Sequence, residues 1–157
     1  MLLLSDFQTS VKRAFSEIDP QWPEYKGLVV CGSHSPENAK KIIQEIEIAR
    51  VKGIPFLGIC WGHQLAAIEY ARNVLGIMDA TSEEYGKGTF IVRKRPELKV
   101  GLHEGVSWWS NYEVDPEFEA KWEKPEHFIT VAFHPEYQSS KTNPHPILVQ
   151  FLELCKK

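Results

Sequence analysis

The stretch Ile54-Pro55-Phe56-Leu57-Gly58-Ile59-Cys60-Trp61-Gly62-His63-Gln64 decides the fold. Its apolar first half predicts a buried strand, and the Ala/Leu/Ile-rich residues that follow it predict a helix. Cys60 falls on the sharp turn between the two, flanked by Gly58 and Gly62, which permit tight backbone geometry. At the start of a helix the amide dipoles favour a thiolate, and the backbone amide of Trp61 can stabilise an oxyanion. The stretch therefore predicts a nucleophile elbow.

A second apolar run, residues 128–133, predicts another buried strand that ends at His134-Pro135-Glu136. Because the carboxyl ends of parallel strands share one edge of a sheet, His134 can meet Cys60 there. His134 would take the thiol proton, and Glu136 would orient the imidazole. A lone cysteine is more often a small buried hydrophobe, and a lone histidine at a strand end is more often a capping residue. The combination of both favours a Cys-His-Glu triad.

Strands and helices alternate along the rest of the chain. This alternation predicts an α/β fold with a doubly wound, mostly parallel sheet and helices on both faces. Thr9 or Ser10 is expected to cap the first helix, and Gly53 to end the second. Two strands, 89–93 and 99–103, are expected as an antiparallel extension. Strands are predicted at 2–7, 27–31, 54–58, 89–93, 99–103 and 128–133, and helices at 9–18, 36–52, 61–75 and 147–155.

Composition narrows the class of protein. The chain has 157 residues, 43% hydrophobic and 25% charged, which suits a single domain over residues 1–157. The net charge of −3 favours neither nucleic acid nor an anionic membrane as a partner. The apolar residues 2–4 are too few for a signal peptide or a membrane span. Three cysteines without framework spacing indicate the cytoplasm. The histidines lack ligand spacing, so no metal or other cofactor is expected.

The elbow and the histidine motif together resemble a known family. Gly58-Ile59-Cys60-Trp61-Gly62-His63-Gln64 with His134-Pro135-Glu136 is similar to the signature of the class I, triad-type glutamine amidotransferases. Residues 67–85, 134–140 and 144–148 resemble more specifically the glutaminase domain of CTP synthases and their free-standing paralogues. The resemblance covers about residues 27–85 and 107–154. It implies a flavodoxin-like amidotransferase domain, shortened at its N-terminus.

The resemblance also implies roles for single residues. Cys60 would be the nucleophile, with His134 and Glu136 completing the triad. Gln64 and Glu84 would contact bound glutamine, Glu84 at the α-ammonium group. The backbone amides of Ser33 and Trp61 would form the oxyanion hole.

Three departures from the family pattern concern the substrate. Ser33, in Gly32-Ser33-His34-Ser35, replaces a glycine of the oxyanion loop, although its amide can still donate. Asn111 replaces an arginine that contacts the α-carboxylate of glutamine, so a charged bidentate contact is lost. The span between Tyr85 and Val106 lacks the segment that precedes the GTP-contacting lid of CTP synthases. The departures favour a free-standing paralogue.

Three functional interpretations remain open. The first is an amide hydrolase that releases ammonia from glutamine or a related γ-glutamyl amide through a thioester. The second is a weak or inactive paralogue that acts as a binding or regulatory protein, and the third is a hydrolase of another γ-glutamyl compound. The expected partners are a small-molecule amide and either a synthetase or a regulatory protein. The pair Trp108-Trp109 is typical of packing or of an interface.

Overall fold

The central sheet has four parallel strands. The structure, a computed structural model, describes residues 1–33 and 35–157, so His34 of the predicted oxyanion loop lies outside the described residues. The strand order is β1-β2-β3-β7, and all neighbouring pairs are parallel. The strands are β1 (Leu2–Leu4), β2 (Leu28–Val30), β3 (Phe56–Ile59) and β7 (Phe128–Val131). The predicted parallel sheet is confirmed, with strands shorter than expected.

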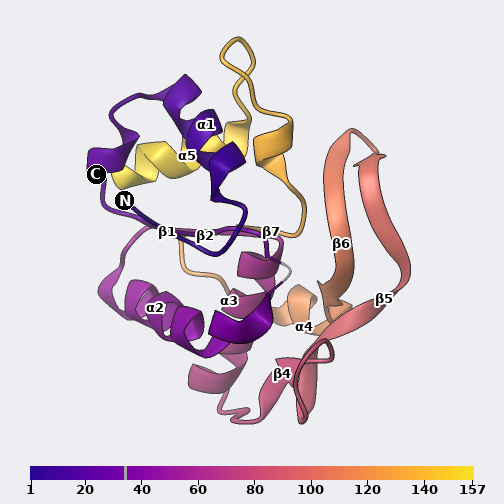
Figure 1. The fold of residues 1–157 in the computed structure, drawn as a ribbon. Coiled ribbons are helices and arrows are strands. Elements are labelled where there is room, and N and C mark those ends of the chain that lie inside the picture. The colour runs from indigo at the N-terminus through magenta and orange to yellow at the C-terminus, as the bar shows by residue number, and fades with distance from the viewer. Residues whose placement is uncertain (34) are drawn as a thin grey trace.

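Helices cover both faces of this sheet (Figure 1). On one face lie α1 (Gln8–Ile18) and α5 (Pro146–Cys155), and on the other lie α2 (Ala39–Lys52) and α3 (Trp61–Asn73). Short 3₁₀ turns add η1 (Trp22–Glu24), η2 (Pro36–Asn38) and η3 (Pro135–Tyr137). The connection from β1 through α1 to β2 and the connection from β2 through α2 to β3 each lead to the next strand in the same direction across the sheet. Because α1 and α2 lie on opposite faces, the two connections have opposite handedness.

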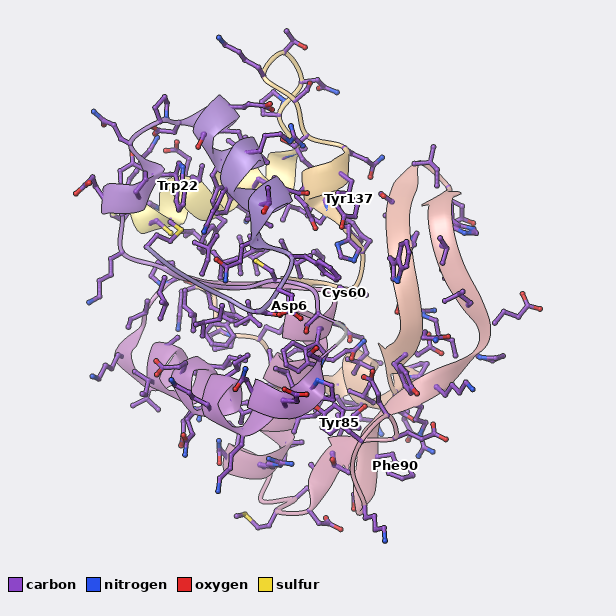
Figure 2. The ribbon with its side chains drawn as sticks, in the orientation of Figure 1. Asp6, Trp22, Cys60, Tyr85, Phe90 and Tyr137 are labelled. Carbon is purple, nitrogen blue, oxygen red and sulfur yellow. The ribbon has the colours of Figure 1, made fainter. Side chains whose placement is uncertain are left out.

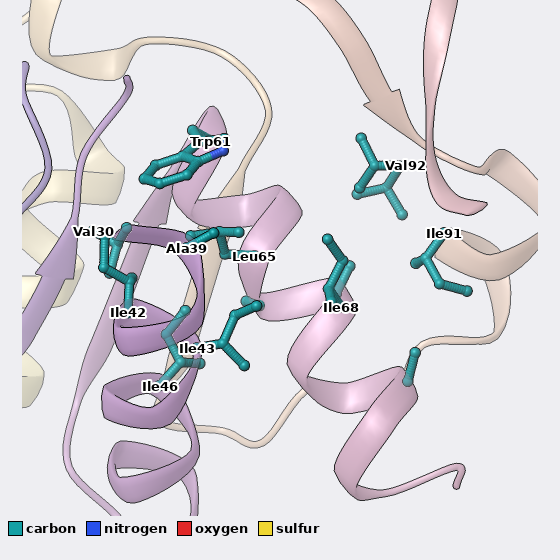
Figure 3. Packing of buried hydrophobic residues seen from close by; sticks show 14 of the residues in the cluster. Val30, Ala39, Ile42, Ile43, Ile46, Trp61, Leu65, Ile68, Ile91 and Val92 are labelled. Carbon is teal, nitrogen blue, oxygen red and sulfur yellow. The ribbon is translucent and has the colours of Figure 1, made fainter. Parts of the chain in front are cut away.

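Each face of the sheet has its own apolar core. Val30, Ile46 and Leu65 belong to the core under α2 and α3, which is shown in Figure 3. Phe15 and Phe151 belong to the core under α1 and α5, where their rings stack with centroids 5.9 Å apart. Burial of each such side chain contributes about 1.5–3 kcal/mol. The two cores fix the sheet whose carboxyl edge carries the site.

A second, three-stranded sheet lies beside that carboxyl edge. It consists of β4 (Ala80–Ser82), β5 (Thr89–His103) and β6 (Val106–Val114), and α4 (Pro116–Lys121) follows it. β4 pairs parallel with β5, and β5 pairs antiparallel with β6. The β5–β6 hairpin stands next to the main body (Figure 1).

Several predicted boundaries are wrong for local reasons. Thr9 and Ser10 do not cap the first helix, because α1 already begins at Gln8 and Phe7 occupies the N-cap position. The predicted strands 89–93 and 99–103 are one continuous strand, which carries an irregularity in its pairing with β6 between Lys94 and Lys99. Gly53 ends α2 with φ 65°, as predicted. Among the described residues, the helices are too short or too polar to cross a membrane.

Candidate active site

Cys60 is the single residue between β3 and α3. Its backbone has φ 53° and ψ −101°, a conformation that costs a non-glycine residue about 1–3 kcal/mol. The neighbouring structure holds it there: the Cys60 amide donates to the carbonyl of Val131 at 2.8 Å, and the Gln64 amide donates to the Cys60 carbonyl at 3.2 Å. Figure 2 shows Cys60 at the end of the sheet that faces the hairpin. The predicted strand-to-helix turn is therefore present.

Two glycines let the backbone approach closely around this turn. A Cβ on Gly62 would lie 2.1 Å from the carbonyl oxygen of Val30, so any side chain would push α3 off the sheet. A Cβ on Gly32 would lie 3.0 Å from the imidazole Cε1 of His134 and 2.9 Å from the ring of Phe7. Gly32, at the start of the predicted oxyanion loop, thus packs directly against the histidine.

His134 follows β7 and is 2% exposed. Its Nδ1 lies 2.7 Å from Oε1 of Glu136, whose side chain is fully buried. Arg13 of α1 donates to the Glu136 carbonyl at 2.9 Å, which fixes the turn that carries the carboxylate. The Tyr137 ring stacks on the imidazole with centroids 4.9 Å apart. These contacts set the orientation of the imidazole.

The electrostatics of the histidine depend on Cys60 and Glu136. Burial alone would lower the pKa of His134, but hydrogen bonds to Cys60 and Glu136 outweigh burial and raise this pKa to about 10. The imidazole is therefore positively charged at neutral pH.

A pocket of about 110 Å³ opens at this edge of the sheet. It is smaller than the roughly 300–1,000 Å³ of sites for drug-sized ligands and suits a ligand of amino-acid size. Seven predicted site residues line it, whereas Glu136 lies behind His134. The lining residues are Phe7, Gly32, Ser33, Cys60, Trp61, Gln64, Glu84, Leu98, Trp109, Ser110, Asn111, Tyr112 and His134.

The sequence interpretation placed Asn111 of β6 in the site but missed the backbone contacts that this hairpin strand makes at the pocket. The Cys60 thiol donates to the Trp109 carbonyl at 3.4 Å, and the Gln64 side-chain amide donates to the Tyr112 carbonyl at 3.2 Å. These partners are backbone groups, which leave no signal in the residue types. In the sequence, the one indication of these carbonyl contacts is that Trp109 lies two positions before Asn111, a predicted substrate residue.

His63 lies outside the pocket lining. It is 4% exposed, its ring packs 5.5 Å from the Trp122 ring, and its Nε2 lies 3.0 Å from Glu119 Oε2. His63 therefore connects α3 to α4 and packs in the interior. Within residues 1–33 and 35–157, no cluster of three or more His, Cys, Asp or Glu side chains is arranged to hold a metal.

The fold and this site define a class of protein. The family described as "Glutamine amidotransferase class-I" matches residues 4–154, and the chain belongs to this family. Among known relatives it is 33% identical over 179 residues to a CTP synthase of Methanoculleus marisnigri, covering 83% of this chain and 34% of that protein. It is 29% identical to a CTP synthase of Acinetobacter baylyi, covering 99% of this chain and 42% of that protein.

The fold is that of the CTP synthase glutaminase domain. A solved structure described as the glutaminase domain of Trypanosoma brucei CTPS with bound acivicin superimposes with a TM-score of 0.74 at 18% identity, covering 99% of this chain and 94% of that one. The chain spans about a third of the length of the first curated relatives it matches. The predicted family and fold class are confirmed.

Proposed function

We propose that this chain hydrolyses the side-chain amide of glutamine or of a related γ-glutamyl compound and releases ammonia. The observation that carries the proposal is that His134 lines one pocket with Cys60, a cysteine at the start of a helix, and is paired behind the pocket with the buried Glu136 at 2.7 Å. The three side chains supply a nucleophile, a proton carrier and an orienting carboxylate. Their arrangement corresponds to a nucleophile–base–orienter triad.

The chemistry begins with attack of the Cys60 thiolate on the amide carbon. The carbonyl becomes a tetrahedral oxyanion, which the backbone amides of Trp61 and Ser33 would stabilise. The Ser33 hydroxyl already donates to Asp6 at 2.5 Å and accepts from the Ser35 amide at 2.8 Å. We therefore assign the oxyanion contact of Ser33 to its backbone amide.

His134 completes the reaction as acid and then as base. Because its pKa is raised to about 10, His134 holds a proton at neutral pH that it can give to the departing ammonia. Collapse of the tetrahedral intermediate breaks the C–N bond and leaves a γ-glutamyl thioester on Cys60. The now neutral imidazole takes a proton from water, and the resulting hydroxide attacks the thioester. Cleavage of the C–S bond releases the carboxylic acid and restores the Cys60 thiolate beside the charged imidazole.

The other pocket residues would select the substrate. Glu84 would contact the α-ammonium group, and Gln64 would contact the bound amide. Asn111 stands where the resemblance predicts an arginine for the α-carboxylate. The loss of this charge favours a γ-glutamyl compound without a free α-carboxylate as a second candidate substrate, and it also supports a weakly active regulatory paralogue.

The fate of the ammonia is part of the proposal. The matched relatives are named CTP synthases, and this chain corresponds to about a third of their length. We propose that a synthetase or a regulatory protein is the partner, and that neither nucleic acid nor a membrane is one. We further propose that no cofactor is required and that the reaction takes place in the cytoplasm.

The experiment is to measure ammonia release from glutamine, γ-glutamyl amides and asparagine. Cys60→Ala is the control for contaminating activity. We expect at least one γ-glutamyl amide to release ammonia with the native chain and not with Cys60→Ala. Equal release by both, or release from none of the amides, would reject hydrolysis as the function.

A further inference from the structure

The β5–β6 hairpin is joined by a backbone hydrogen bond to the loop after β7 that carries His134 and Gln138, here called the catalytic loop. The His134 amide donates to the Ser107 carbonyl of β6 at 2.8 Å. Two residues further along β6, the Trp109 carbonyl accepts from the Cys60 thiol. The strand that forms one wall of the pocket thus contacts both the nucleophile and the histidine.

Gln138 adds a second connection from the same loop. Its Oε1 accepts from the Ser107 amide at 2.9 Å, and its Nε2 donates to the Gly105 carbonyl. One side-chain amide therefore pairs with two backbone groups of the hairpin, as a neighbouring strand would. Gln138 lies four residues after His134 and is itself held by η3, because its backbone amide donates to the Pro135 carbonyl at 3.1 Å.

The tip of the hairpin is exposed, and a ring contact lies behind it. The Trp108 ring packs 6.1 Å from the Phe133 ring. Toward the tip, Leu102 is 69% exposed, and residues 103–105 are exposed as well. A segment with so few buried contacts opens at a low free-energy cost, so single hydrogen bonds matter to its position.

We propose that Gln138 is a positioning residue that holds the hairpin against the catalytic loop. Its two side-chain hydrogen bonds to the hairpin are here called the latch. Through Ser107 it fixes the backbone of His134, and through β6 it holds the Trp109 carbonyl against Cys60. Release of the latch moves the pocket wall away and frees the thiol from the Trp109 carbonyl. The part of this inference that concerns turnover rests on the proposed hydrolysis, whereas the latch itself does not.

The test compares Gln138→Leu with the native chain by amide hydrogen exchange and by the rate of Cys60 alkylation with iodoacetamide. Loss of the two hydrogen bonds should speed exchange of the peptide covering residues 104–110 by about tenfold, and Cys60 should be alkylated several-fold faster. Gln44→Leu, at an exposed position on α2, is the matched control and should change neither rate.

A second variant guards against a general loss of folding. Gln138→Glu keeps the acceptor for the Ser107 amide but loses the donor to Gly105, so its exchange rate should lie between those of the native chain and Gln138→Leu. Where hydrolysis is measurable, the KM of the amide should rise more than kcat falls, because Gln138 bonds the pocket wall directly and reaches His134 only through Ser107, while Glu136 still holds the imidazole.

Two outcomes separate this inference from the proposed function. Unchanged exchange and alkylation in Gln138→Leu would overturn the latch, whatever the hydrolytic activity. Faster exchange and alkylation in a chain that releases no ammonia would support the latch and reject hydrolysis.

Discussion

The Cys60 thiol lies 3.4 Å from the backbone carbonyl oxygen of Trp109, a residue 49 positions later in the chain. This contact joins the two sheets of the molecule at the pocket, because Cys60 leaves the parallel sheet and Trp109 belongs to the hairpin. The thiol is thus held between the carbonyl of a hairpin strand and the imidazole of His134. Its reactivity therefore depends on both sheets.

Cys60 is expected to be the most reactive of the three thiols. Cys31 and Cys155 are buried, and burial raises the pKa of the Cys31 thiol above its usual range and that of Cys155 to about 12. A glutamine-like diazoketone or chloroketone should therefore label Cys60 alone. Peptide mass spectrometry reads the site, and Cys60→Ala should remain unlabelled and folded. Label on Cys31 or Cys155 in place of Cys60 would contradict the assignment of the nucleophile.

The charge of His134 is expected to depend on Cys60. Burial opposes the charged form, and the hydrogen bonds to Cys60 and Glu136 raise the pKa of His134 from 6.5 to about 10. Removing the sulfur in Cys60→Ala should therefore lower this pKa, which an NMR titration of the imidazole resonances measures. An imidazole that titrates at the same pH in both chains would show that the sulfur has no part in the shift.

The raised pKa of His134 also affects the free energy of unfolding. Because the pKa of His134 is higher in the folded chain, protonation favours the folded state. Its contribution to the free energy of unfolding is fully present below about pH 6.5 and is lost as the pH rises through about 10. Urea unfolding at several pH values, with His134→Asn as the reference, isolates this contribution.

A buried ion pair between α2 and α3 is expected to be critical for stability. Arg50 donates to both carboxylate oxygens of Glu69 at 2.8–3.0 Å, and the Glu69 side chain is 1% exposed. Arg50→Leu would leave the carboxylate buried, with the Asn73 side-chain amide still donating to it at 3.1 Å. Loss of one partner of a buried pair costs about 3–5 kcal/mol, measured by urea unfolding.

Two further variants test the cause of that loss. Arg50→Leu combined with Glu69→Leu removes both charges and should recover most of the stability, because no buried charge is left unpaired. Arg93→Leu breaks the exposed pair with Asp115 and should cost no more than about 1 kcal/mol. A double variant as unstable as Arg50→Leu would show that packing, and not charge, is responsible.

The sequence predicted the part of the site that the parallel sheet brings together. The strand before Cys60 and the strand before His134 are short apolar runs. The rule that parallel strands share a carboxyl edge placed both residues at one end of the molecule. In the structure β3 and β7 are direct neighbours in register, and the two residues line one pocket.

Asn111 was predicted to contact the substrate, but its strand β6 was not predicted, and the turn before β6 explains why. The connection between β5 and β6 is Glu104-Gly105, with φ 52° and 76°. Two-residue turns of this kind favour Asn-Gly or Asp-Gly, so Glu-Gly gives a weak signal. Trp108 and Trp109 were interpreted as packing or an interface. In the strand they point to opposite faces, with Trp108 near Phe133 and Trp109 52% exposed.

The last prediction concerns selection of the substrate at Asn111. This residue lines the pocket one position before Tyr112, whose carbonyl accepts from Gln64. An arginine here could form a bidentate contact with an α-carboxylate, which asparagine cannot. A hydrogen bond to a charged group contributes about 1.5–3 kcal/mol. Asn111→Arg should therefore raise kcat/KM for free glutamine by about tenfold to a hundredfold.

Asn111→Arg should leave kcat/KM unchanged for a γ-glutamyl amide whose α-carboxylate is blocked, and Asn111→Gln is the control for side-chain length. Strong native glutaminase activity that falls in Asn111→Arg would show that another group of this pocket already binds the carboxylate.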